Sequence, residues 1–78
     1  MMSVEQCRGA RGMLGWSQAK LADHANVSLS TVRDFEKGRH LPHRRNMLTL
    51  INVMEGAGIE FLPENGEGDG VRYNRPRE

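Results

Sequence analysis

The sequence predicts a small, mostly α-helical domain in which four short helices precede a C-terminal β-hairpin. Apolar residues recur at three- and four-residue spacing up to residue 56. Residues that start or stop helices interrupt this pattern at regular intervals. Beyond residue 58, the composition changes to two short β-prone runs separated by turn formers. With 78 residues, the chain has room for one domain with a marginal core.

The first helix is predicted over residues 3–14, where Val4, Cys7, Ala10 and Leu14 share one face. Gly15 ends it, because glycine enters the left-handed backbone region at a helix end without strain. A second helix is predicted to begin at Gln18. Ser17 precedes it as an N-cap, whose side-chain oxygen can accept a hydrogen bond from an unpaired backbone N–H. The apolar stripe of this second helix consists of Leu21, Ala22 and Ala25.

A tight turn at Asn26, which tolerates left-handed backbone, leads to a third helix. Ser28 is its predicted N-cap, and Gly38 ends it. Val32 and Phe35 give this helix its inner face. This third helix is therefore predicted to cover about residues 28–37.

Residues 39–43 form a predicted loop, since Pro42 lacks a backbone N–H and disfavours helix in the residue before it. A fourth helix is predicted over 44–56, ended by Gly56 and Gly58. Its apolar residues are Met47, Leu48, Leu50, Ile51 and Met54.

The remaining tail predicts a hairpin with strands at 59–62 and 71–73 and a long loop at 63–70. A lone two-stranded hairpin is marginal in water. We therefore expect it to pack on the helices or to pair with another chain. The predicted organisation is a domain over 1–57 followed by a hairpin and tail over 58–78, which could serve in dimerisation.

Charge is distributed unevenly along a chain whose formal net charge is +1. Residues 1–45 carry eight Lys or Arg against four acidic residues, whereas residues 46–78 carry three Arg against six acidic residues. This asymmetry favours one face for a polyanion and another that avoids it. The single cysteine excludes an internal disulfide, and no apolar run could span a membrane. The cytoplasm is the expected location.

Residues 17–38 carry the functional signal: a short helix, a turn, and a second short helix with a Ser cap and a Gly stop. Val27, Val32 and Phe35 face the core. The outward face of the predicted third helix is expected to hold Leu29, Ser30, Arg33 and Asp34. This is the arrangement of a helix-turn-helix, in which the second helix of the motif is the recognition helix and enters the DNA major groove. Here the recognition helix is the predicted helix of about residues 28–37.

This segment resembles the Xre-like helix-turn-helix family, which includes phage Cro proteins and phage repressors. The matching residues are Trp-Ser-Gln-Ala-Lys-Leu-Ala at 16–22, Val-Ser at 27–28, and Ser-Thr-Val-Arg-Asp-Phe-Glu-Lys-Gly-Arg at 30–39. The resemblance covers about residues 3–57 and implies a four-helix lambda-repressor-like domain. It also implies a prokaryotic transcriptional regulator, a repressor for example, that binds an operator in double-stranded DNA as a homodimer.

The resemblance also assigns roles. Gln18 would bond a phosphate, and Arg11 and Glu36 would form an ion pair that braces the motif. Base chemistry pairs Arg33 with guanine, Asp34 with cytosine and Leu29 with a thymine methyl. The positions that face bases or nearby phosphates are Ser28, Leu29, Ser30, Arg33 and Asp34, with Thr31 a weaker candidate for a phosphate. The loop cations expected to neutralise phosphates are Lys37, Arg39 and Arg44, with Arg45 beside them.

Other interpretations stay open. Leu29 and Ser30 could be ordinary surface residues, the basic run at 37–45 could be a solvated loop, and Asp34 would repel phosphates. The histidines and Cys7 lack metal-ligand spacing, and no motif indicates a cofactor or a catalytic centre, so we predict no enzyme.

For the dimer contact, we expect the fourth helix and the hairpin to contribute. The hairpin residues would be Ile59, Phe61, Val71 and Tyr73. An alternative function is a protein-binding module, an antitoxin or an anti-activator, that uses the hairpin or the fourth helix against a partner. A nucleoid protein without sequence preference fits less well, because the chain is only weakly basic.

Overall fold

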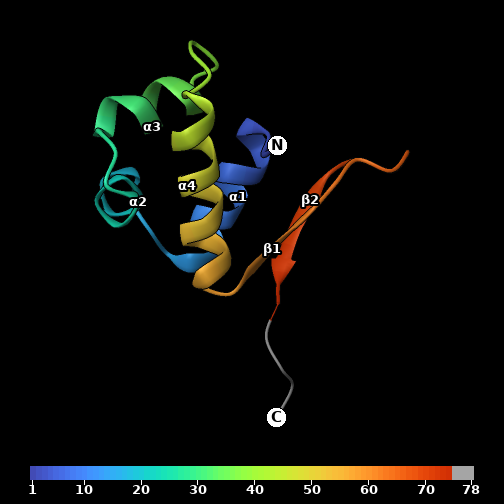
Figure 1. Ribbon diagram of the computed structural model, residues 1–78. Helices are drawn as coiled ribbons and strands as arrows, with labels where there is room; N and C mark the ends of the chain where they lie inside the picture. The colour runs from blue at the N-terminus through green and yellow to red at the C-terminus, as the bar shows by residue number, and fades with distance from the viewer. Residues whose placement is uncertain (75–78) are drawn as a thin grey trace.

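The computed structural model describes residues 1–74 and has four helices followed by a two-stranded antiparallel sheet (Figure 1). This arrangement confirms the predicted fold class. No helix in the described residues is both long enough and apolar enough to cross a membrane. The elements are α1 (Val4–Leu14), α2 (Gln18–Ala25), α3 (Leu29–Glu36), α4 (Arg44–Gly56), β1 (Ile59–Leu62) and β2 (Gly70–Tyr73).

Helix ends follow the local signals closely. Ser3 is the N-cap of α1 and forms a capping box with Gln6, so this helix starts one residue later than predicted. The Oγ atoms of Ser17 and Ser28 accept backbone hydrogen bonds at the starts of α2 and α3. Asn26, with φ of 55°, makes the left-handed turn between these two helices. Local capping chemistry therefore sets the frame of the helix-turn-helix.

The third helix is shorter than the predicted 28–37, because Ser28 caps it and Lys37 already lies beyond its last turn as the C-cap. Gly38 follows with φ of 75° and turns the chain into the loop.

One core joins the helices and the sheet. In it, α2 packs against α3 and α4, and α1 packs against α3 and β2. The largest fully buried side chains of this core are Phe35, Leu21, Leu50, Met54, Ile59, Val32 and Cys7.

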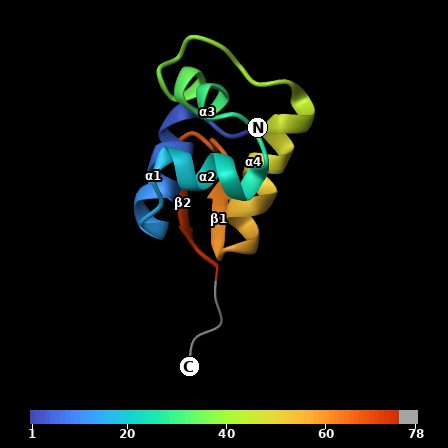
Figure 2. The ribbon, with the colours of Figure 1, turned by 90° about the vertical axis from the view of Figure 1, so that its left-hand side faces the viewer.

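The hairpin lies on the side of α1 and α4 that faces away from α2 (Figures 1 and 2). Strand β1 contacts α4 and β2 contacts α1. The Gln6 side-chain amide donates to the carbonyl oxygens of Leu62 and Gly70, both at 2.9 Å, and so ties α1 to both strands. The described part of the hairpin therefore shares one folded body with the helices, while residues 75–78 of the predicted tail lie outside the described range.

The side chains of the four predicted dimer residues lie on the inner face of the hairpin. Ile59 pairs with Tyr73 and Phe61 with Val71, and side chains alternate between the two faces of a strand. Ile59 is only 1% exposed, Phe61 and Val71 pack against the core, and the Tyr73 hydroxyl donates to the Met13 carbonyl. The helices therefore cover much of the apolar face of the hairpin, although Tyr73 remains 43% exposed, and the pairing of these residues with a second chain stays a prediction. The outer face carries the ion pair between Arg72 and Glu60.

Candidate nucleic-acid interface

An exposed polar stripe runs along α3, which packs across α2 in the helix-turn-helix arrangement. Ser30, Arg33 and Lys37 are all exposed, and their spacing of three and four residues places them on one side of the helix. Within residues 1–74, Arg33 makes no ion pair. The stripe therefore offers a hydroxyl and two cations to an incoming ligand.

Three hydroxyls form a small hydrogen-bonded group at the start of α3. The Ser28 Oγ lies 3.1 Å from the Ser30 Oγ and 2.8 Å from the Thr31 Oγ1, while it also accepts from the Thr31 backbone N–H. Ser28 therefore serves first as a cap, and its hydroxyl helps to orient the exposed Ser30 side chain. Thr31 is half-buried behind them.

Two residues of the predicted outward face are less exposed to solvent than expected. Leu29 is half-buried and packs against the core, because its position three residues before Val32 turns it partly inward. Asp34 is also half-buried and lines a hollow of about 170 Å³ together with His40 and His43 from the following loop. The freely exposed part of α3 is thus narrower than the sequence predicts.

A buried ion pair fixes α3 against α1. The Arg11 Nη2 atom lies 2.7 Å from Glu36 Oε1, and Arg11 Nε donates to Glu36 Oε2 at 2.9 Å, as the family resemblance predicts. Gln18 Nε2 also donates to Glu36 Oε1 at 3.0 Å, and the Cys7 thiol donates to Oε2 at 3.2 Å. One carboxylate therefore gathers donors from α1 and α2 and holds the end of α3 in place.

Burial and the hydrogen bonds to Glu36 shift the pKa values of Glu36 and Cys7. Burial alone would raise the pKa of Glu36, but hydrogen bonds from Arg11, Gln18 and Cys7 outweigh it, so the pKa lies below its ordinary value. Burial, together with the neighbouring carboxylate, raises the pKa of the Cys7 thiol and keeps it protonated. This thiol is consequently a structural donor with little nucleophilic character.

The basic segment of residues 37–45 continues from α3 through the loop into the first turn of α4 (Figure 1). Its four cations are exposed: Lys37, Arg39, Arg44 and Arg45. The structure adds two residues that the sequence analysis did not select. Leu41 is 81% exposed at the side of the loop, and Arg8 lines a hollow of about 260 Å³ with Gln18 and Lys37. Leu41 could have been selected from the sequence, because it lies within the basic segment. The position of Arg8 beside Gln18 and Lys37 depends on tertiary packing and could not.

A family model described as a helix-turn-helix domain matches residues 4–58. The chain belongs to this helix-turn-helix family. The family lies within the Xre and Cro-like group, which confirms the resemblance, and it indicates a DNA-binding protein. A search among curated proteins gave no significant match.

The helix-turn-helix match ends at Gly58, where the chain leaves α4 for the hairpin. All ten residues selected from the sequence for DNA contact lie inside the match, on α2, on α3 or its N-cap, in the loop, or at the start of α4. Trp16, just before α2, has a structural contact: its ring stacks on that of His24 with centroids 4.7 Å apart. Within residues 1–74, no group of three or more His, Cys, Asp or Glu side chains is placed to hold a metal ion.

Proposed function

We propose that this protein is a sequence-specific transcriptional regulator that places α3 in the major groove of double-stranded DNA. The observation that carries the proposal is the exposed Ser30, Arg33 and Lys37 stripe, held by the Arg11–Glu36 brace and continued by the basic segment. A helix about 10–12 Å across with its side chains fits the width of the major groove.

Base reading depends most on Arg33, whose guanidinium can donate two parallel hydrogen bonds to guanine O6 and N7. Ser30 can donate to or accept from a neighbouring base edge. Asp34 can accept from a cytosine amine only after the groove edge reaches its half-buried position. Leu29 has a smaller share, because only part of its side chain remains available for a thymine methyl.

Phosphate contacts flank the base-reading stripe. One N–H of the Gln18 amide is used by Glu36, and the second can donate to a phosphate in the hollow that Arg8 and Lys37 also line. Arg39 and Arg44 would contact the backbone farther along the groove. These contacts supply affinity that does not depend on sequence but falls as salt rises.

Selection of bound sequences from a random duplex pool tests the proposal, followed by titration of the winning duplex against salt. We expect an enriched site and a steep salt dependence. The Arg44→Ala variant should lower the salt slope by about one unit for each subunit bound, because it removes one phosphate contact. Arg72→Ala is the matched control, since this exposed arginine lies on the hairpin and should leave the slope unchanged. A pool that shows no enrichment would overturn sequence-specific reading.

We further propose that the regulator binds DNA as a homodimer joined along α4. This helix starts beside the loop that follows α3 and runs away from α3 (Figure 1), so a two-fold axis along it would direct both recognition helices to one side. The described residues span 36 × 29 × 20 Å, which suits subunits whose recognition helices lie about 34 Å apart on DNA. Leu48, which is 39% exposed, gives α4 an apolar group on its outer surface.

The Leu48→Glu variant should weaken the dimer roughly tenfold or more, because it places two carboxylates in an apolar contact. Sedimentation equilibrium measures the dissociation constant, and circular dichroism checks that the variant remains folded. Asn65→Glu supplies a charge-matched control on the exposed hairpin loop. Equal association of both variants would exclude α4 as the dimer contact.

A further inference from the structure

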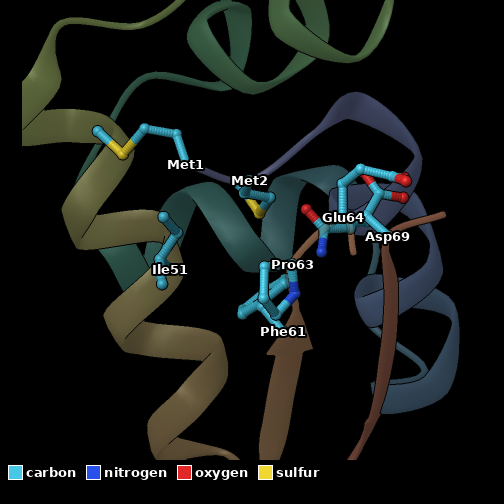
Figure 3. Close-up of a pocket in the computed structure, with 8 residues that line it drawn as sticks. Met1, Met2, Ile51, Phe61, Pro63, Glu64 and Asp69 are labelled. Carbon is cyan, nitrogen blue, oxygen red and sulfur yellow. The ribbon is translucent and has the colours of Figure 1, made fainter. Parts of the chain in front are cut away.

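An open apolar trough lies between the N-terminus, α4 and the hairpin loop, away from the residues assigned to DNA contact (Figure 3). Its volume is about 500 Å³. Met1 and Ile51 form one side and Phe61 and Pro63 the middle, while the carboxylates of Glu64 and Asp69 stand together on the other side (Figure 3).

The two carboxylates give one side of the trough a negative rim that no ion pair neutralises within residues 1–74. Neither Glu64 nor Asp69 forms an ion pair within residues 1–74, and no Lys, Arg or His side chain lines the trough. This charge would repel phosphate groups, so nucleic acid is a poor occupant. A cationic group would gain from the rim instead.

The walls of the trough are held in place before any occupant arrives. The backbone N–H groups of Gly66 and Gly68 donate to Glu64 Oε2 at 2.8 and 3.1 Å, which fixes the loop around this carboxylate. The Gln6 amide fastens the two strand ends below the loop through Leu62 and Gly70. A preformed site loses less conformational entropy on binding.

We propose that this trough docks a segment of a partner protein in which an apolar side chain lies next to an arginine or lysine. The apolar side chain would pack on Phe61 and Ile51, and the cation would bind the carboxylates of Glu64 and Asp69. Because Met1, Pro63, Glu64 and Asp69 are exposed, the trough is open along its length and admits a continuous chain. This surface adds a protein-binding activity to the proposed regulator and uses none of its DNA-contacting residues.

Selection from a displayed library of random 12-residue peptides on the full-length protein provides the probe. We expect winners that combine an apolar residue with an adjacent Arg or Lys. For a winning peptide, the Asp69→Asn variant and the Glu64→Gln, Asp69→Asn double variant should each weaken binding, the double variant by roughly tenfold or more, as expected for a close charge pair. Glu67→Gln is the matched control, since this exposed carboxylate on the same loop does not line the trough.

The outcomes separate this proposal from DNA binding. Duplex affinity should be unchanged in the double variant, so loss of peptide binding alone supports the trough. Thermal unfolding shows that the protein remains folded, and Asp69→Asn leaves the loop hydrogen bonds to Glu64 in place. No enrichment, acidic winners, or equal loss in the Glu67→Gln control would overturn the proposal. Self-association of the wild-type protein that disappears in the double variant would also overturn it, because the occupant would then be a second copy.

Discussion

Replacement of Arg33 by alanine is expected to abolish preference for the selected operator while leaving weak, non-specific DNA binding. A bidentate contact to guanine contributes about 1 to 3 kcal/mol of discrimination, and a homodimer makes it twice. The expected loss is therefore about 2 to 6 kcal/mol, or roughly thirtyfold or more in affinity. Fluorescence anisotropy with the operator and a scrambled duplex measures this loss directly.

The exposed position of Arg33 makes this a clean test, because its side chain forms no ion pair within residues 1–74. Arg33→Lys keeps the charge but not the fork of donors, so it should restore non-specific affinity without restoring discrimination. A variant that loses operator and scrambled duplex equally would assign Arg33 to a phosphate instead of a base.

The frame of this interface was predictable because its signals are local. Ser17, Ser28 and Asn26 each determine a helix end through hydrogen bonds or backbone preference within a few residues of themselves. The ion pair of Arg11 and Glu36 was predictable only through family resemblance, since 25 residues separate its partners.

Other features depend on tertiary packing that spacing does not encode. The alternation of side chains along the two strands places Phe61 on the same face as Ile59 and Val71. It does not predict whether the helices or another chain cover that face. Leu29 was expected to face outward because it starts the recognition helix, yet its side chain reaches the core. The Cys7 thiol on Glu36 is a further case, because the apolar spacing of α1 predicted a plain core residue.

Removal of the Glu36 carboxylate should have the largest effect on stability. Glu36→Ala would leave Arg11, Gln18 and Cys7 without their shared acceptor, and loss of one partner from a buried ion pair costs about 3 to 5 kcal/mol. Urea unfolding measures this change. Such a loss is a large part of the about 5 to 15 kcal/mol that holds a small domain folded.

A double variant separates this cost from any general loss of packing at the site. Arg11→Met with Glu36→Leu replaces the pair by apolar side chains, so it should recover most of the stability lost in Glu36→Ala. Equal destabilisation of the single and double variants would contradict a penalty that arises from the unpaired charge of Arg11.

Stability should also depend on pH through Glu36, whose pKa lies below its ordinary value of 4.5 in the folded protein. A group with a depressed folded pKa stabilises the protein fully above its unfolded pKa and loses this contribution as pH falls through the folded pKa. The difference in unfolding free energy between the wild type and Glu36→Gln should therefore be constant from pH 7 to about 5 and shrink below about 4.5. The Cys7 thiol stays protonated throughout this range, because its pKa is raised, and does not contribute to the change. Urea unfolding of both proteins between pH 7 and 3 tests this, and a difference that does not change with pH would show that the brace acts through shape alone.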